Sequence, residues 1–453
     1  MNPHVFRQYD IRGRADADLT DDFARKLGLA LGTFWIRRRA KRVALARDCR
    51  LSSPRLHRAL LEGLLETGIE VLDTGVGPTP QMYFAVFHGD LDGGVMITGS
   101  HNPSEDNGFK MMKGKASLYG DDIQALKALM KDEDFERQAA GRVVQHDVVP
   151  AYLGFLRGNI RPGRKLRFAI DAGNGAAGPL AKRAFEALGQ TPKLLLCEMD
   201  GRFPNHHPDP TVPENLKLLI DTVRRESLDF GIAFDGDGDR VGVVDGDGTV
   251  LWGDRLLTVL ARDLLTRRPG AAILGEVKCS QLLYDDIAAR GGRPIMWKTG
   301  HSLIKAKMKE EGALLAGEMS GHIFFKDRFF GFDDAIYVAA RIVELLGEGP
   351  NLKDRTADLP NMHITPELRV PCPDELKFEV VEAVRRHFRP KYEVIEVDGA
   401  RILFGDGAWG LVRASNTGPV LVMRFESKTK AALQKHRDAV EAVVDDALAS
   451  LKK

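Results

Sequence analysis

The sequence predicts an α/β protein with three similar doubly wound mixed-sheet domains and a smaller C-terminal α+β domain. The chain has 453 residues, which is too long for one hydrophobic core and is typical of three or four domains. Segments with the apolar spacing of strands and helices alternate along most of its length, as in doubly wound folds. After residue 350 several strands and two helices replace this alternation, which is typical of an α+β domain.

Changes in the same pattern give the predicted domain boundaries. The polar stretch near residues 132–147 is typical of a linker. A third unit begins near Trp252, and the alternation ends near Pro350. The four predicted domains span residues 1–146, 147–250, 251–361 and 362–453.

In the first domain, periodic apolar residues separate helices from strands. Leu56, Leu60 and Leu64 recur at helical spacing. Gly68 follows them as a typical helix end. The predicted elements of this domain are strand 42–46, helix 53–67, strand 69–72, helix 79–88, strands 93–97 and 107–112, and helix 121–131.

The alternation continues through the second and third domains. The second has predicted strands 166–170, 193–197 and 230–234, helices 176–188 and 214–226, and a hairpin that turns at Asp245-Gly-Asp-Gly. The third has helices 253–267, 280–290 and 302–311, and strands 271–277, 293–297 and 313–316. Each of the three units ends a strand in a loop rich in glycine and polar residues, which is a weak repeat of architecture.

The last domain has predicted helices 374–387 and 428–451 and strands 392–397, 400–404, 409–413 and 420–425. A loop dense in polar side chains joins the last two strands. This mixture of strands and flanking helices favours a small α+β unit.

Composition excludes several functional classes. The net charge of +1 provides no global field for nucleic acid or an acidic membrane. The four cysteines lie far apart without a CxxC pair, which argues against a zinc ribbon and for a reducing compartment. The sequence shows no secretory leader and no apolar run that spans a bilayer. We therefore expect a cytoplasmic enzyme with small-molecule partners, as a monomer or small homo-oligomer.

A serine lies where α/β sheets bind ligands. The apolar run 93–97 predicts a buried strand, and Thr-Gly-Ser100-His-Asn-Pro follows it as a turn. Open α/β sheets bind ligands beyond the carboxyl ends of their strands. Ser100 is therefore either a nucleophile or phosphoryl carrier, or only part of a structural turn.

Three aspartates predict a metal site. Asp235, Asp237 and Asp239 alternate with glycines directly after a predicted strand. Their mutual repulsion calls for a hard divalent cation, and Mg²⁺ keeps positions open for phosphate oxygens. The alternative is a solvated Asp-Gly turn, which we expect instead at Asp245 and Asp247.

Two arginines are candidate phosphate ligands. Arg240 follows the aspartates and either binds a phosphate or balances their charge. The loop Arg413-Ala-Ser-Asn-Thr-Gly-Pro combines a guanidinium, two hydroxyls and an amide. These donors suit a phosphate dianion, although a hairpin turn explains them as well.

The loop Gly317-Glu-Met-Ser-Gly-His is a candidate sugar site. Glu318 and Ser320 can bind sugar hydroxyls there, or can serve only as a helix cap and a turn. His301 is a candidate proton carrier or a structural histidine. Lys278 either contacts substrate or is solvated.

One further motif has the form of a dinucleotide fingerprint. Gly173-Asn-Gly-Ala-Ala-Gly178 follows a strand and opens a helix. Two residues separate the strand from the first glycine, where the fingerprint has none. Close packing of helix on strand explains these glycines equally well, so we do not expect NAD binding.

The motifs together resemble those of the α-D-phosphohexomutases, most closely the phosphomannomutase/phosphoglucomutase branch. They occur in the family order: Thr98-Gly-Ser-His-Asn-Pro, Asp235-Gly-Asp-Gly-Asp-Arg, Gly317-Glu-Met-Ser-Gly-His and Arg413-Ala-Ser-Asn-Thr. The segments Tyr9-Asp-Ile-Arg12-Gly and Asp106-Asn-Gly-Phe-Lys110 also match. The resemblance covers essentially the whole chain.

The resemblance implies four domains around a central cleft, each contributing one loop. Because water must be kept from a phosphoserine, we also expect the last domain to close as a lid. The resemblance implies that Ser100 is phosphorylated and that Arg12, Lys110 and His301 are catalytic or transfer protons. The predicted catalytic residues are Ser100, Arg12, Lys110, Arg240 and His301. The predicted Mg²⁺ ligands are Ser100, Asp235, Asp237 and Asp239. The predicted substrate-binding residues are Tyr9, His101, Lys278, Gly300, Glu318, Ser320, His322, Arg413, Ser415, Asn416 and Thr417.

The implied activity is reversible phosphoryl transfer between O1 and O6 of mannose or glucose phosphates. The phosphoserine and a hexose 1,6-bisphosphate, which also serves as activator, carry the phosphoryl group. A glucosamine-phosphate mutase, a metal-dependent sugar-phosphate phosphatase and a non-catalytic sugar-phosphate sensor are the alternatives.

Overall fold

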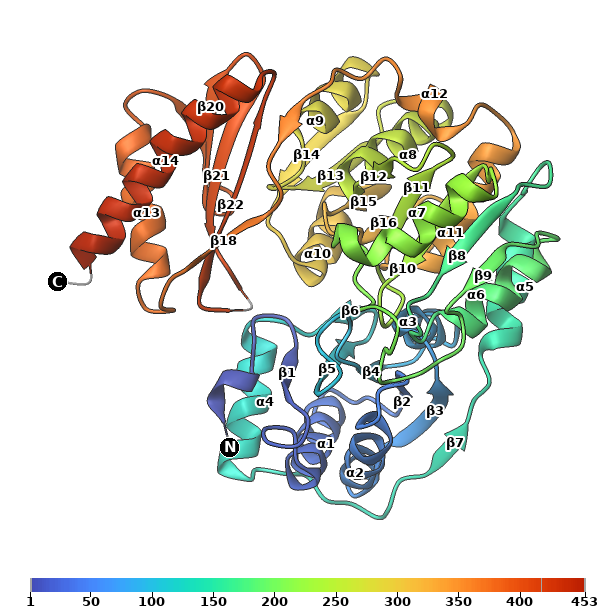
Figure 1. Cartoon of the computed structure of the whole chain (residues 1–453). Helices are drawn as coiled ribbons and strands as arrows, with labels where there is room; N and C mark the ends of the chain where they lie inside the picture. The colour runs from blue at the N-terminus through green and yellow to red at the C-terminus, as the bar shows by residue number, and fades with distance from the viewer. Residues whose placement is uncertain (1, 417, 452–453) are drawn as a thin grey trace.

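The computed structural model describes residues 2–416 and 418–451. It has four sheets in four successive units (Figure 1), so the predicted fold class is confirmed. In Figure 1 the first unit lies at the bottom, and the fourth lies at upper left beside the third. No helix within this described part is long and apolar enough to cross a membrane.

The first unit has a mixed sheet in the order β1-β5-β4-β2-β3-β7, with β6 beside β5. Its strands are β1 (Ile11–Arg14), β2 (Arg42–Arg47), β3 (Glu70–Val76), β4 (Gly93–Ile97), β5 (Asp106–Lys113), β6 (Ala116–Ser117) and β7 (Val143–Gln145). Its helices are the 3-10 helix η1 (Pro3–Val5), α1 (Asp21–Ile36), α2 (Ser53–Leu65), α3 (Thr79–His88) and α4 (Asp121–Asp132).

Helix α1 and strand β7 form where no element is expected from the sequence. Two glycines within α1 lower its helix propensity, but Gly28 is needed where α1 crosses α2. A Cβ on Gly28 would lie 2.2 Å from the Leu60 carbonyl oxygen. The linker expected near 132–147 contains β7, whose backbone pairs in parallel with β3. Tertiary pairing thus overrides the polar local sequence.

The second and third units repeat the mixed-sheet design. The second contains α5 (Val149–Asn159), β8 (Phe168–Asp171), α6 (Gly178–Ala187), β9 (Lys193–Leu195), η2 (Pro213–Leu216), α7 (Lys217–Arg225), β10 (Phe230–Phe234), β11 (Val241–Asp245) and β12 (Val250–Leu251). The third contains α8 (Gly253–Arg267), β13 (Ala272–Glu276), α9 (Gln281–Ala289), β14 (Arg293–Trp297), α10 (His301–Glu311), β15 (Leu315–Gly317), β16 (Ile323–Phe325), α11 (Ala335–Gly347) and α12 (Leu352–Thr356). Helices α5, α11 and α12 are additions to the predicted elements. Helix α11 is buried on almost all sides, so its sequence lacks the alternation of apolar and polar faces that predicts a surface helix.

The three sheets place their polar loops identically. Each loop follows a strand that pairs in parallel with its neighbour, and leads into an antiparallel strand. The loop joins β4 to β5 in the first unit, β10 to β11 in the second, and β15 to β16 in the third. The preceding strands pair in parallel with β2, β8 and β13. This repeat brings the three loops to equivalent sheet edges.

A shared hydrophobic core joins the first three units. It includes residues from β4, β8 and β16, together with helices α3, α5 and α11. The ring of Phe84 contacts Tyr152 and Phe155 of the second unit and Phe330 of the third. Close-packed side chains allow little relative movement. We therefore expect the loops of these three units to keep fixed positions relative to one another.

The fourth unit has an antiparallel sheet covered by two helices (Figure 1). Its elements are β17 (His363–Ile364), β18 (Leu368–Pro371), α13 (Lys377–Phe388), β19 (Glu393–Ile395), β20 (Ala400–Gly405), β21 (Ala408–Ala414), β22 (Val420–Ser427) and α14 (Lys430–Leu451). A small apolar cluster of Val277, Trp409 and Leu411 joins it to the third unit. The buried pair Arg424–Asp254, 3.1 Å apart, crosses the same boundary.

Candidate active site

A cleft of about 1670 Å³ is lined by residues from all four units. Its lining contains fourteen of the predicted site residues: Tyr9, Arg12, His101, Lys110, Arg240, Lys278, Gly300, His301, Glu318, Ser320, His322, Arg413, Ser415 and Asn416. Ser100 and the three aspartates are buried next to these lining residues. Segments more than 300 residues apart in sequence therefore meet at one site.

Ser100 is held in an unusual backbone conformation directly after β4. Its φ angle is +49°, in the left-handed region that non-glycine residues rarely adopt. Its amide donates to the Thr98 hydroxyl over 2.8 Å. Its Oγ donates to Asp235 Oδ2 over 2.9 Å and lies 3.1 Å from His101 Nδ1. The first and second loops thus meet at this hydroxyl.

The aspartate loop is a suitable cation site. Ligand atoms of Asp235, Asp237 and Asp239 lie within 4.8 Å of one another, and all three side chains are fully buried. Burial, together with the other two carboxylates, raises the pKa of Asp235 well above its usual range. Asp237 Oδ1 is buried and has no hydrogen-bond partner among the described residues. An orphaned carboxylate oxygen within an anionic group fits a bound Mg²⁺.

Two cations from the first unit approach the aspartates. Lys110 Nζ lies 2.7 Å from Asp237 Oδ2 and also contacts Asp239. Arg12 forms an ion pair with Asp10 and donates to the Asn102 side chain over 3.2 Å. Both side chains therefore place positive charge beside the Ser100 loop, where a phosphoryl group would need it.

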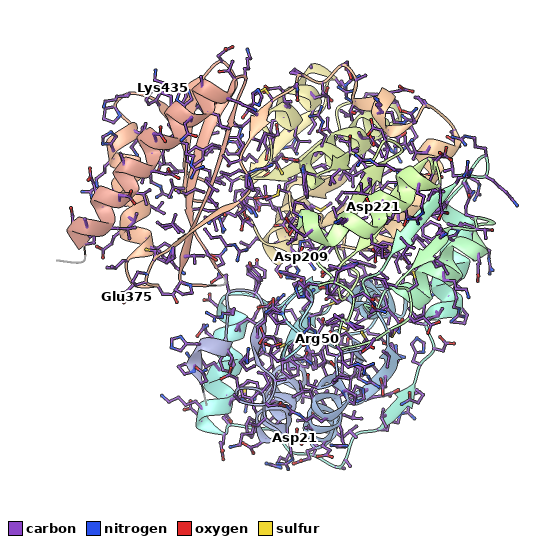
Figure 2. The ribbon with its side chains drawn as sticks, in the orientation of Figure 1. Asp21, Arg50, Asp209, Asp221, Glu375 and Lys435 are labelled. Atoms are coloured by element: carbon purple, nitrogen blue, oxygen red, sulfur yellow. The ribbon has the colours of Figure 1, made fainter. Side chains whose placement is uncertain are left out.

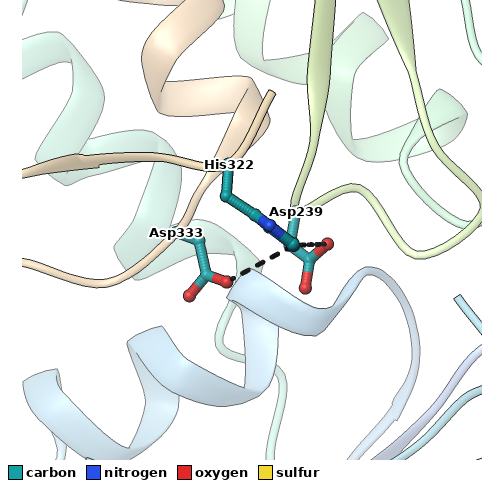
Figure 3. A group of neighbouring side chains, drawn as sticks. All are labelled: Asp239, His322 and Asp333. Carbon is teal, nitrogen blue, oxygen red and sulfur yellow. Dashed lines mark hydrogen bonds and ion pairs between the residues drawn. The ribbon is translucent and has the colours of Figure 1, made fainter. Parts of the chain in front are cut away.

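His322 connects the second and third loops (Figure 3). Its Nδ1 lies 2.7 Å from Glu318 Oε2, and its Nε2 lies 3.2 Å from Asp239 Oδ1. Burial lowers the pKa of His322, but Asp239 and Glu318 outweigh that effect and raise it to about 9. Asp333 lies 3.9 Å from the same nitrogen, Nε2. In this arrangement His322 is cationic at neutral pH.

The pKa of His301 shifts in the opposite direction to that of His322. Its side chain is buried at the start of α10, and neither ring nitrogen has a hydrogen-bond partner in residues 2–416 and 418–451. Burial and nearby Lys305 lower the pKa of His301 well below 6.5. The ring of Tyr9 packs edge-on against it, with centroids 5.5 Å apart. A neutral imidazole therefore faces the cleft beside a cationic one.

Arg240 lies between the first and third loops. Its backbone amide donates to Asp235 Oδ1 over 3.0 Å. Its Nε lies 3.2 Å from His322 Nε2, and its Nη1 lies 3.4 Å from His101 Nε2. The guanidinium can therefore contact a group carried by Ser100 while it remains held by the second loop.

The fourth unit contributes cationic and polar groups to the cleft. Arg413 Nε donates to Asp398 over 3.0 Å, and its Nη2 is buried without a hydrogen-bond partner among the described residues. Ser415 is buried and Asn416 is partly exposed beside it. Thr417 lies outside the described residues. The orphaned guanidinium nitrogen provides an unused donor for an anion.

The other predicted residues line a further part of the cleft. Lys278 Nζ donates to Glu367 over 3.0 Å, and its pKa is raised by Glu276 and Glu367 against the effect of burial. The Gly300 amide donates to Glu318 over 2.6 Å. Ser320 Oγ lies 3.4 Å from His322 Nδ1. The carboxylate of Glu318 is therefore fixed by two neighbours.

Comparison with known proteins identifies the family. Four family models match successive parts of the chain: phosphoglucomutase/phosphomannomutase α/β/α domain I over residues 3–137, domain II over 151–248, domain III over 252–362, and the C-terminal domain over 367–443. The chain belongs to the phosphoglucomutase/phosphomannomutase family.

Relatives of this family match over nearly the full chain. A phosphomannomutase/phosphoglucomutase of Pseudomonas aeruginosa is 47% identical over 433 residues, covering 95% of this chain and 93% of the relative. A phosphoglucomutase of Neisseria gonorrhoeae is 45% identical, covering 97% and 96%. The crystal structure of a phosphoglucomutase/phosphomannomutase family protein from Burkholderia thailandensis has a TM-score of 0.92 at 44% identity, covering 98% and 97%. The chain is an isomerase that transfers a phosphoryl group between O1 and O6 of hexose phosphates.

Sequence reasoning missed several polar residues of this phosphohexomutase site. Asp333 is buried, contacts Lys305 Nζ over 2.9 Å, and lies 3.7 Å from His301 Nδ1. The acidic pair before α11 was the available signal for it. His207 contacts the His101 carbonyl and connects the second unit to the Ser100 loop. The run His206-His207-Pro-Asp was the corresponding signal.

His206 is expected to make the stability of this family member depend on pH. Its Nε2 lies 3.1 Å from Asp171 Oδ2, and this hydrogen bond raises the pKa of His206. A raised histidine pKa contributes stability that is fully present below about pH 6.5 and is lost as pH rises through the folded pKa. We expect H206N to destabilise the protein by up to about 1 kcal/mol near pH 5.5, and by less at pH 9.

Thermal unfolding of wild type and H206N at both pH values measures this effect. H4N, which changes an exposed histidine, is the control. An H206N effect of equal size at both pH values contradicts the assignment.

Proposed function

We propose that Ser100 carries the phosphoryl group and donates it to a hydroxyl of a hexose monophosphate. The resulting hexose 1,6-bisphosphate turns within the cleft and returns its other phosphoryl group to Ser100. Free bisphosphate primes the serine as an activator. The observation that carries the proposal is the Ser100 hydroxyl, 2.9 Å from Asp235 where the first and second loops meet.

The transfer exchanges one bond for another. The sugar hydroxyl oxygen bonds to phosphorus as the bond from phosphorus to Ser100 Oγ breaks. The hydroxyl proton passes to a base, for which neutral His301 is the proposed acceptor. Cationic His322 is the proposed proton donor to Ser100 Oγ as it leaves in the same step, and both proton movements reverse in the return transfer. Two groups whose environments separate their pKa values are typical of paired acid and base roles.

Positive charge supports the transferred group. We assign Arg12, Lys110 and Arg240 to its oxygens. Asp235, Asp237, Asp239 and Ser100 would hold Mg²⁺, the metal on which this family depends. When bound, the ion would offset negative charge on the phosphoryl oxygens.

The fourth unit is the proposed phosphate clamp and lid. Arg413, Ser415 and Asn416, together with Thr417, hold the phosphate that is not reacting. Either end of the bisphosphate must fit this clamp, because the intermediate turns between the two transfers. Closure of the unit excludes water, which would otherwise hydrolyse the phosphoserine.

We propose that the sugar site accepts both glucose and mannose. Glu318, Ser320 and Lys278 bind hydroxyls, with Tyr9, Gly300 and His101 lining the site. Glucose and mannose differ only at C2, so a loop that grips other hydroxyls accepts both.

Turnover of glucose 1-phosphate and mannose 1-phosphate tests this specificity. We expect kcat/KM values within about 100-fold, since a site that does not bind the C2 hydroxyl discriminates between its two positions by no more than about that factor. Glucosamine 1-phosphate is the comparison substrate. A value for mannose 1-phosphate thousands of times lower than for glucose 1-phosphate contradicts dual specificity, and release of phosphate without isomer formation favours a phosphatase.

A further inference from the structure

A fully buried arginine lies beneath the Ser100 loop. Arg50 is 0% exposed, and Figure 2 shows it on the side of the first unit that faces the second and third units. It belongs to the segment between β2 and α2, and none of its atoms lines the cleft. Burying a guanidinium is costly unless its charge and donors are satisfied, so its partners reveal what it holds.

The partners of Arg50 are the carbonyl groups of the serine loop. Nη2 donates to the Ser100 carbonyl over 2.7 Å and to the Asn102 carbonyl over 2.6 Å. Nη1 donates to the Asp106 carbonyl over 2.9 Å and also to that of Pro103. One planar group thus binds four backbone oxygens of a single loop, which a lysine ammonium cannot reproduce with three donors.

A carboxylate completes the support. Asp48 Oδ2 lies 3.3 Å from Arg50 Nε and accepts from the Gly99 amide over 3.3 Å. Its Oδ1 accepts from the Arg50 amide over 3.0 Å and from the Ser53 hydroxyl. The charge of Arg50 is therefore balanced within the first unit, independently of the aspartate loop.

Gly99 allows the guanidinium to lie directly against the loop. A Cβ at this position would lie 2.5 Å from Arg50 Cζ, closer than such atoms ever approach. The next residue is Ser100, whose left-handed φ of +49° persists only if its surroundings enforce it. The contact with the Ser100 carbonyl provides that enforcement.

The same contact sets the direction of the next amide. The peptide between Ser100 and His101 is trans, so its N–H points away from its C=O. Because the carbonyl points to Arg50, the His101 N–H points away from Arg50. In the described part of the chain this N–H donates to no acceptor. Because His101 lines the cleft, we infer that its unused N–H donor points from the serine loop toward the cleft.

We propose that Arg50 is a positioning residue that fixes the Ser100–His101 peptide, so that Ser100 Oγ faces Asp235 and the His101 amide faces the phosphoryl group on the serine. The inference rests on the proposed role of Ser100 as phosphoryl carrier. Arg50 itself touches neither substrate nor metal. Its effect falls on the transfer step, because a preorganised donor acts on charge that develops there.

R50M, R50K and G99A test the proposal, since each alters the same contact. The control is R341M, which removes another buried guanidinium that donates to a backbone carbonyl, at Asp327 over 3.2 Å, in the third unit. Circular dichroism and thermal unfolding report folding. Steady-state turnover of glucose 1-phosphate gives kcat and KM. Enzyme phosphorylated beforehand with glucose 1,6-bisphosphate is then mixed with glucose 1-phosphate. The fraction of phosphoryl groups transferred to the sugar is compared with the fraction released by hydrolysis.

We expect R50M to lower kcat about 100-fold or more while KM changes by less than about threefold, as for loss of a preorganised donor. The transfer-to-hydrolysis ratio should fall with kcat. R50K and G99A should show smaller losses of the same kind, and R341M should leave kcat and the ratio near wild type. If R50M does not fold, the kcat, KM and transfer-to-hydrolysis ratio of G99A test the proposal instead.

Two results overturn the proposal. One is a folded R50M, or a folded G99A, with wild-type kcat and ratio. The other is an equal loss in R50M and R341M, which would mean that Arg50 acts only on stability. Wild-type enzyme that turns over without a phosphate on Ser100, seen by intact mass, would instead refute the proposed function of Ser100.

Discussion

Ser100→Ala is expected to lower kcat by at least about 10,000-fold, because removing a nucleophile removes the covalent route entirely. The protein should still fold, since the loop is held by Arg50 and Asp48 through backbone groups. Intact mass should show no phosphate after incubation with glucose 1,6-bisphosphate. Turnover of glucose 1-phosphate measures the loss.

Ser104→Ala is the matched control for the serine. Ser104 lies in the same loop and is exposed, and its hydroxyl contacts only Glu105 among the described residues. Its replacement should leave kcat near wild type. Isomer formation by S100A at a rate close to that of S104A contradicts the carrier role of Ser100.

Asp235→Asn is expected to lower kcat about 1,000-fold and to weaken Mg²⁺ binding. Its two oxygens accept from Ser100 Oγ and from the amides of Asp239 and Arg240. The amide side chain keeps the size of the carboxylate but removes a charged oxygen ligand from the site. Calorimetric titration with Mg²⁺ measures the metal effect separately from turnover.

Asp247→Asn is a control of the same local sequence. Asp247 lies in the second Asp-Gly-Asp segment, at the hairpin turn between β11 and β12, where it is exposed and contacts Lys353. We expect neither kcat nor Mg²⁺ affinity to change. Equal loss of Mg²⁺ affinity in both variants would place the metal elsewhere.

The sequence predicts the residues whose chemistry is concentrated in short motifs. Ser100 and the three aspartates stand in polar loops that follow strands, and Arg413 lies near the end of β21 beside another polar loop. Such loops can be recognised in a sequence because turn-forming residues directly follow the apolar pattern of a strand. The structure brings these segments together around one cleft, and Thr417 lies outside the described residues.

The residues that support the site are harder to predict. Arg50 and Asp333 act through contacts with segments far along the chain, and nothing next to them in sequence indicates those partners. The segment Ala46-Arg-Asp-Cys49, which precedes Arg50, gives no local indication of a contact with the serine loop. Helix α1 was missed for a related reason, since Gly28 is explained only by its contact with α2. Long-range packing, rather than local preference, decides these features.

Single-turnover transfer from labelled phosphoserine tests the central claim most directly. Enzyme labelled only on Ser100 is mixed with unlabelled glucose 1-phosphate, and the products are separated at successive times. We predict that label appears first in glucose 1,6-bisphosphate and then at O6 of glucose 6-phosphate, while Ser100 regains unlabelled phosphate. Label that stays on Ser100, or leaves as inorganic phosphate, while glucose 6-phosphate forms would contradict the account.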